Sequence, residues 1–67
     1  MAIVDVTIIE GRDAATKAAL MRRLTDAVID TVGAESRQVR VVIREVRNGD
    51  YAVGGDPVIL PQPGEEP

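Results

Sequence analysis

The chain has no cysteine and no histidine among its 67 residues. Without cysteine, neither a disulfide nor a thiolate-bound metal can brace so short a chain. Without histidine, the commonest zinc ligand and the commonest general base are missing, and a Ser-His-Asp arrangement is excluded. We therefore expect no cofactor and no metal, and any proton transfer must use a different base.

Aromatic residues are also scarce, and basic residues are outnumbered by acidic ones. Tyr51 is the only aromatic residue, so the core must be aliphatic. The formal net charge is -3 and no basic run occurs, which argues against a nucleic-acid partner. No apolar run approaches membrane-spanning length, and the first residues carry no signal-peptide pattern. We expect no membrane partner and a cytoplasmic location.

The first dense apolar run lies at the amino terminus. Its side chains alternate, with one face apolar and the other nearly so, which predicts a strand near residues 3–9 that is buried on both sides. Gly11 ends the strand and Arg12 stands at the turn. The apolar face holds Val4, Val6 and Ile8, and the second face holds Ile3, Asp5, Thr7 and Ile9.

A helix is predicted near residues 14–32. Asp13 is a favourable N-cap, and Gly33 is the glycine expected just after a helix end. An apolar stripe at helical spacing indicates packing against a sheet, with a partner-helix groove or a membrane surface as alternatives. The stripe holds Leu20, Met21, Leu24, Ala27, Val28, Thr31 and Val32.

A second strand is predicted near residues 39–46. Strand, long helix and strand make a β-α-β unit of class α/β (α+β), in which the strands are parallel and the crossover right-handed. Such a unit leaves one sheet face and the sheet edges open, and a chain this short builds only a small core. We therefore expect oligomerisation.

The remaining residues predict a turn, a hairpin and a tail. Asn48-Gly49-Asp50 is a turn signal, and residues 51–53 form a short strand or hairpin arm that ends at Gly54-Gly55. We expect one domain over residues 1–56 and a proline-rich extended tail over residues 57–67. Within the tail, residues 58–60 are apolar enough to dock on a neighbour.

Taken together, these segments resemble the 4-oxalocrotonate tautomerase family. The resemblance covers Ala2 to about Gly55, and it rests on the following order of segments. A strand is followed by Glu10-Gly11-Arg12, a long helix, Val39-Arg40-Val41-Val42-Ile43 and Gly49-Asp50-Tyr51-Ala52-Val53-Gly54-Gly55. The spacing of the two arginines and the Gly-Gly hairpin makes the resemblance specific.

The resemblance implies an assembly and an activity. Family subunits pair into dimers with a shared sheet, and three dimers typically build a hexamer. We expect a homo-oligomer of this kind, with a mixed oligomer as an alternative. Members are isomerases without cofactors. An amino-terminal proline, exposed when the initiator methionine is removed, moves a proton in small enol or keto carboxylates, and arginines bind the substrate carboxylates.

Carried over by position, the resemblance assigns site residues. The catalytic positions are Ala2, where the family has its proline, and the arginines Arg12 and Arg40. An unperturbed α-amine has a pKa of about 7.7–8.0, and burial or nearby cations lower it toward neutrality. Alanine lacks the rigid secondary amine, so we expect impaired activity. The resemblance assigns substrate binding to Arg12, Arg40, Tyr51, Ile9 and Val53.

Each of these residues also has a structural interpretation. Arg12 can be a surface charge after a turn, and Tyr51 can fill the core. Arg40 lies inside a β-branched strand, where an unpaired charge is costly, so an ion pair with Glu45 or Asp5 is the alternative. The remaining strand and connector arginines, Arg37 and Arg44, are expected to be solvated or interfacial.

Two further functions stay open. One is a catalytically silent subunit, either a natural partner in a mixed oligomer or an altered form of an active enzyme. The other is a small oligomeric module that binds a carboxylate without turnover.

Overall fold

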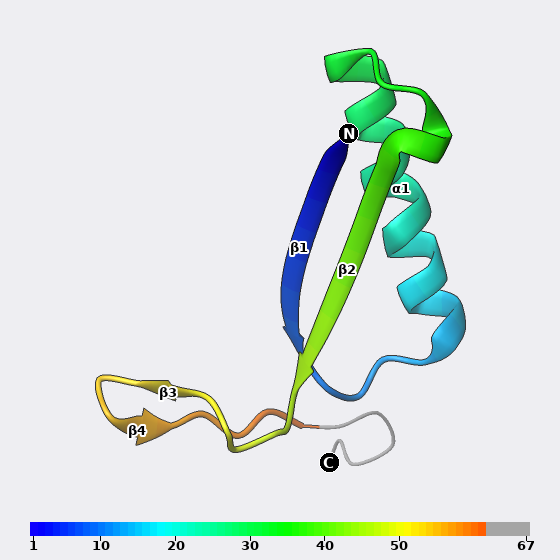
Figure 1. Ribbon diagram of the computed structural model, residues 1–67. Coiled ribbons are helices and arrows are strands. Elements are labelled where there is room, and N and C mark those ends of the chain that lie inside the picture. The colour runs from blue at the N-terminus through cyan, green and yellow to red at the C-terminus, as the bar shows by residue number, and fades with distance from the viewer. Residues whose placement is uncertain (62–67) are drawn as a thin grey trace.

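The structure, a computed structural model, describes residues 1–61 as a β-α-β unit followed by a hairpin (Figure 1). The parallel strands β1 and β2 pair in register from Ala2 opposite Val39 to Ile9 opposite Val46. The short strands β3 and β4 pair antiparallel. The predicted fold class is confirmed. In chain order the elements are β1 (Ala2–Ile9), α1 (Ala14–Val32), the 3-10 helix η1 (Ser36–Gln38), β2 (Val39–Val46), β3 (Ala52–Val53) and β4 (Asp56–Pro57).

The ends of α1 follow from two residues. The Asp13 side chain accepts a hydrogen bond from the Thr16 backbone N–H at 2.8 Å, which satisfies one of the amide groups left free in the first turn. At the other end Gly33 adopts a left-handed conformation, with φ 85°, and its N–H bonds to the Ile29 carbonyl. The helix therefore has the predicted bounds, 14–32.

The helix covers one face of the sheet, and the contact between them is the core. The β1 residues Val4, Val6 and Ile8 are half-buried there, and Val39 at the start of β2 is buried with 8% exposure. The predicted helical stripe is correct only in part. Within the stripe, Leu20, Leu24 and Val28 are half-buried on the side of the helix that faces the sheet. The other members, Met21, Ala27, Thr31 and Val32, are exposed.

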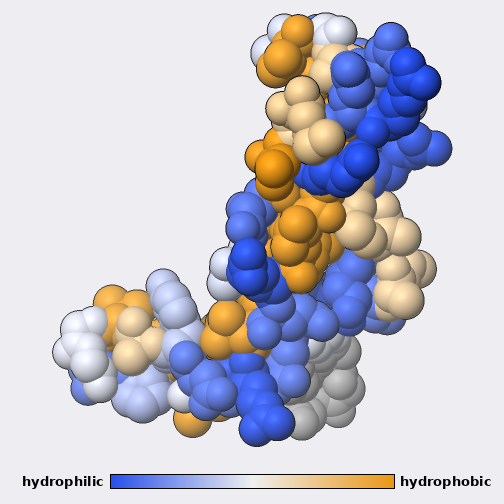
Figure 2. Space-filling model, in the orientation of Figure 1, coloured by the Kyte–Doolittle hydropathy of each residue, from blue (hydrophilic) through white to orange (hydrophobic). Residues whose placement is uncertain are grey.

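The opposite face of the sheet is uncovered. Ile3 is 68% exposed and Val42 is 40% exposed, so the expected burial of the first strand on both sides is wrong for the single chain. Figure 2 shows an apolar band along the strands, bordered by hydrophilic residues. On this face Arg44 forms a two-pronged ion pair with Asp5, with Nε 3.0 Å from Oδ1.

The hairpin extends sideways from the end of the sheet where both long strands terminate (Figure 1). Its backbone is held at its base, because the Val58 N–H bonds to the Tyr51 carbonyl at 2.7 Å. The described chain has a radius of gyration of 14.9 Å. A compact domain of 67 residues would have about 11 Å. The single chain is therefore an extended body with very little interior.

The start of the predicted tail is bound to the chain itself. Pro57 belongs to β4, and Leu60 exchanges two hydrogen bonds with the Asn48 side chain. Ile59 remains 75% exposed, so residues 58–60 still present apolar surface. The domain boundary after residue 56 stays a prediction, and residues 62–67 of the tail lie outside the described residues. Within residues 1–61, no helix has the length and apolarity needed to cross a membrane.

Candidate active site

The candidate site residues lie at opposite ends of the parallel sheet. We call the end where β1 and β2 begin the amino end, and the end where they terminate the carboxyl end. Ala2 lies at the amino end beside Val39, and Arg40 lies there beside Ile3. Arg12 follows the carboxyl end. An eight-residue strand spans about 23 Å, so one chain cannot bring Ala2 and Arg12 into a single pocket.

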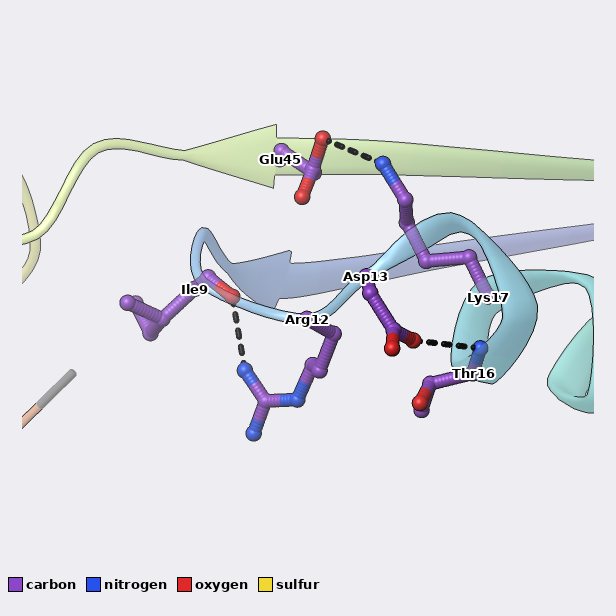
Figure 3. Close-up of polar contacts among 6 residues, drawn as sticks. All are labelled: Ile9, Arg12, Asp13, Thr16, Lys17 and Glu45. Carbon is purple, nitrogen blue, oxygen red and sulfur yellow. Dashed lines mark hydrogen bonds and ion pairs between the residues drawn. The ribbon is translucent and has the colours of Figure 1, made fainter. Parts of the chain in front are cut away.

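The turn from β1 into α1 holds Arg12. Gly11 has φ 126°, which lets the chain leave the strand sharply before the Asp13 cap. The Arg12 guanidinium donates from Nη1 to the Ile9 carbonyl at 2.7 Å, and the side chain is otherwise exposed (Figure 3). This single contact fixes the side chain beside the strand end and leaves most of its donors for a ligand.

At the amino end, Arg40 makes a similar contact. Its Nη1 donates to the Arg37 carbonyl at 2.7 Å, across the junction between η1 and β2. The alternative of an ion pair with Glu45 or Asp5 is wrong in the described chain. Those two carboxylates are taken, since Glu45 pairs with Lys17 and Asp5 pairs with Arg44.

Five cations of the described chain show two different kinds of contact. Lys17, Arg37 and Arg44 lie 3.0 Å from a carboxylate oxygen. The hydrogen bond from Asp5 and its negative charge raise the pKa of Arg44 above its ordinary value. Arg12 and Arg40 instead donate to neutral carbonyls, and no ion pair involves them within residues 1–61. Their charge is available to an anionic ligand.

The three predicted pocket-lining residues lie nearer to Arg12 than to Ala2. Ile9 ends β1 and is half-buried, and its carbonyl holds Arg12. Tyr51 and Val53 belong to the hairpin, which leaves the carboxyl end, and they are 49% and 60% exposed. Tyr51 therefore does not fill the core. Of these three residues, only Ile9 contacts Arg12 in the described chain, and Ala2 and Arg40 lie at the other end of the sheet.

Two residues at the carboxyl end were not predicted from the sequence. The Glu10 carboxylate accepts a hydrogen bond from the Asn48 backbone N–H at 3.1 Å, and the Asn48 side chain binds Leu60. These partners are 38 and 12 residues away, so no local pattern marks them. The turn signal at Asn48 predicts a local turn and indicates no tertiary partner.

This arrangement suits anion binding and proton transfer with an amine. Arginine forks bind carboxylates in two-pronged geometry. Within the described residues, no group of three acidic side chains is placed to hold a metal ion.

Comparison with known proteins defines the class. A family model described as tautomerase enzyme matches residues 3–59. A probable tautomerase from Ralstonia nicotianae is 46% identical over 57 residues, which is 85% of this chain and 81% of that protein. The 2-hydroxymuconate tautomerase of Bacillus subtilis is 40% identical over 55 residues, covering 82% of this chain and 89% of the relative.

Solved structures agree with the sequence comparison. A crystal structure of a 4-oxalocrotonate tautomerase homologue aligns with TM-score 0.77 and 40% identity over 82% of this chain and 87% of its own. A heterohexamer 4-oxalocrotonate tautomerase from Chloroflexus aurantiacus aligns with TM-score 0.79 and 33% identity, covering 85% and 92%. The chain belongs to the tautomerase family, and its subunit is of the 4-oxalocrotonate tautomerase kind.

Proposed function

We propose that this protein is a 4-oxalocrotonate tautomerase-like isomerase that moves a proton between carbons of small enol or keto carboxylates. The observation that carries the proposal is the state of Arg12 and Arg40. Both are held by backbone carbonyls and neither is in an ion pair in the described chain, whereas Lys17, Arg37 and Arg44 are paired with carboxylates. In the proposed site they bind the carboxylate groups, and an amine at the Ala2 position is the base.

Because Ala2 and Arg12 lie at opposite ends of the sheet, two or more subunits must contribute residues to the proposed site. Within residues 1–61, no strand pairs with the edge of β1 that lies away from β2. A second copy added antiparallel along this edge would continue the sheet and reverse its direction. The Ala2 end of one β1 would then lie beside the Arg12 end of the other.

The charge on β1 favours one register for this pairing. A two-fold axis perpendicular to the sheet keeps the half-buried face of both strands on the same side, so only residues of the same face stand opposite each other. Placing Asp5 opposite its own copy is unfavourable because like charges would meet. Shifting by one pair puts Val6 at the axis and Asp5 opposite Thr7 of the partner, whose hydroxyl can donate to the carboxylate.

In the proposed chemistry the arginines stabilise charge, and the amine is the only base. Its nitrogen lone pair accepts a proton from one substrate carbon, the arginines stabilise the negative charge that develops on the oxygens, and the ammonium returns the proton to a second carbon. Proline presents a rigid secondary amine for this step, and Ala2 presents a freer primary amine at best. With Met1 retained, the Ala2 nitrogen is a non-basic amide. We therefore propose weak turnover for the chain as written.

For the assembly we propose a homo-hexamer, a trimer of dimers, because the single chain buries so little. A mixed oligomer is the alternative, and the existence of a heterohexameric solved relative supports it. In that case a silent subunit with Ala2 would supply arginines to a partner that supplies the base. A cytoplasmic location stays a prediction.

Mixing two variants tests the proposal of a shared site. Arg12→Ala and Arg40→Ala subunits should each bind a dicarboxylate poorly by calorimetry. After the two are unfolded together and refolded, about a quarter of sites should regain both arginines if these come from different subunits of a symmetric oligomer. Arg37→Ala is the matched control, because Arg37 already pairs with Glu35. No regained binding, with intact oligomers, would contradict the shared site.

A second measurement separates the enzyme from the silent subunit. Intact mass decides whether the terminal amine belongs to Met1 or Ala2. Turnover of a small dienol dicarboxylate by the purified chain alone supports the enzyme. Dicarboxylate binding without turnover supports the silent subunit or the carboxylate-binding module, and turnover gained on refolding with a proline-bearing relative identifies the mixed oligomer.

A further inference from the structure

We infer that Asn48 is a positioning residue that locks the Arg12 turn to the Tyr51 hairpin, so that both move as one unit. The inference rests on the proposed function for its meaning, since it assigns these two segments to one half of a carboxylate site. It does not rest on that function for its evidence, which is a chain of hydrogen bonds across residues distant in sequence.

The first link joins the Arg12 turn to the end of β2. The Glu10 N–H donates to the Val46 carbonyl at 2.8 Å, which extends the parallel ladder one step beyond Ile9. The Glu10 carboxylate then accepts the Asn48 backbone N–H at 3.1 Å. Glu10 thus contacts β2 through its backbone and the following turn through its side chain. A charged acceptor makes this a stronger bond than one between neutral groups.

The second link joins the same turn to the far side of the hairpin. The Asn48 side chain donates from Nδ2 to the Leu60 carbonyl at 2.7 Å and accepts from the Leu60 N–H at 2.8 Å. Both polar atoms of the amide are therefore used on a single backbone unit, as a neighbouring strand would use them. Between Asn48 and Leu60, the Val58 N–H bond to the Tyr51 carbonyl closes the hairpin.

Asn48 is the only described residue that joins the two links. Its backbone bonds to the turn that carries Arg12, and its side chain bonds to the segment that closes the hairpin. Gly49 follows it with φ 92°, so the chain turns sharply immediately after Asn48. The hairpin has almost no other support, since Tyr51 and Val53 are exposed. Without Asn48 the hairpin would be free to swing relative to Arg12.

The test uses variants that break one link at a time. Asn48→Ala keeps the backbone bond to Glu10 and removes both bonds to Leu60. Glu10→Ala does the reverse, whereas Glu10→Gln keeps a neutral acceptor. Asp30→Ala, an exposed helical acid, is the matched control. Amide hydrogen exchange of Leu60 and Val58 reports the hairpin, and calorimetric titration with a small dicarboxylate reports the site.

We expect Asn48→Ala to speed exchange at both hairpin amides and to weaken dicarboxylate binding about threefold to tenfold, the effect of losing a modest number of hydrogen bonds. Glu10→Ala should also speed exchange at Leu60, although it never touches that residue, and Glu10→Gln should restore most of the protection. Combining both alanine changes should cost less than the sum of the two, because they interrupt one chain.

The outcomes separate the inference from the proposed function. Unchanged hairpin exchange in Glu10→Ala would overturn the coupling, whatever the binding result. Altered exchange in a protein that binds no dicarboxylate even before mutation would support the coupling and overturn the proposed function. Altered exchange with weakened binding in the same variants supports both, and Asp30→Ala should leave both readouts unchanged.

Discussion

The two ends of the sheet are built very differently. At the carboxyl end, Glu10, Asp13, Lys17 and Asn48 each make a side-chain or backbone contact that ties the Arg12 turn to another segment. At the amino end, the described contacts besides the ladder are local to η1 and the start of β2: Arg40 bonds to the Arg37 carbonyl, Arg37 pairs with Glu35, and Glu35 and Gln38 cap η1. Met1 is 83% exposed there. The carboxyl end is therefore held by contacts between segments distant in sequence, whereas the side-chain contacts at the amino end are local.

This difference indicates what each end contributes to the proposed reaction. An anion site works best when its donors are fixed before the ligand arrives. The reactive amine needs a terminus that can be processed and then enclosed. Because the two needs are met at opposite ends of one ladder, subunits that assemble by reversing direction satisfy both. Changes at Ala2 should therefore alter turnover, changes at Arg12 and Arg40 should alter binding, and changes to the contacts of the Arg12 turn should alter local order.

The largest effect is expected at the amino end, from Ala2→Pro. Methionine removal would then expose a rigid secondary amine, and misplacement of a catalytic group can cost about a hundredfold in rate. We expect turnover of a small dienol dicarboxylate to rise by at least that factor, with dicarboxylate affinity nearly unchanged. Equal rates, with Met1 confirmed by mass in the alanine form, would show that the amino terminus is not the base.

An intermediate effect is expected from Arg40→Ala. A charge-assisted bond to a carboxylate is stronger than a neutral one, so affinity for a dicarboxylate should fall roughly tenfold or more. Arg44→Ala is the matched control on the same strand and face, since Arg44 is already paired with Asp5. Calorimetry measures the dicarboxylate affinity of both variants. An equal loss of affinity in the two would mean that the total charge of β2, and not a site at Arg40, controls binding.

The smallest effect is expected at the carboxyl end, from pH. Hydrogen bonds from Thr16 lower the pKa of Asp13 below its ordinary value of 3.8. Ionised Asp13 therefore stabilises the folded helix at pH above that value, and the contribution is lost as pH falls through the lower folded pKa. Asp13→Asn keeps a capping oxygen that does not titrate. Helical circular dichroism against pH should show a shallower acid loss in Asp13→Asn, and parallel curves would contradict the assignment.

Local signals predicted most of the fold. The helix bounds follow from Asp13 and Gly33, each of which acts within a few residues of its own position. The second strand was predicted at residues 39–46 and lies there, whereas the first begins at Ala2, one residue before the prediction. The helical stripe was less accurate, because periodicity cannot tell how far a sheet extends beneath a helix. The last turn of α1, with Val32 71% exposed, runs past the sheet.

The residues of the candidate site stay a prediction, and their arrangement could not be derived from the sequence. The spacing of Arg12 and Arg40 pointed to both positions, but which carboxylates pair with which cations depends on contacts between distant segments. Lys17 taking Glu45 and Arg44 taking Asp5 span 28 and 39 residues. For the same reason nothing in the sequence around Asn48 revealed its link to Glu10.

The near absence of a buried interior has a consequence for how long this protein survives. Val39 is the only buried apolar residue of the described chain, so a single copy has few contacts that stabilise its fold. If assembly supplies the missing burial, folding depends on protein concentration. The measured free energy of unfolding then changes with the concentration of subunits. Dilution would then act as a denaturant. A freshly made chain would be vulnerable to proteases until it met its neighbours, so synthesis rate itself would set the amount of working protein.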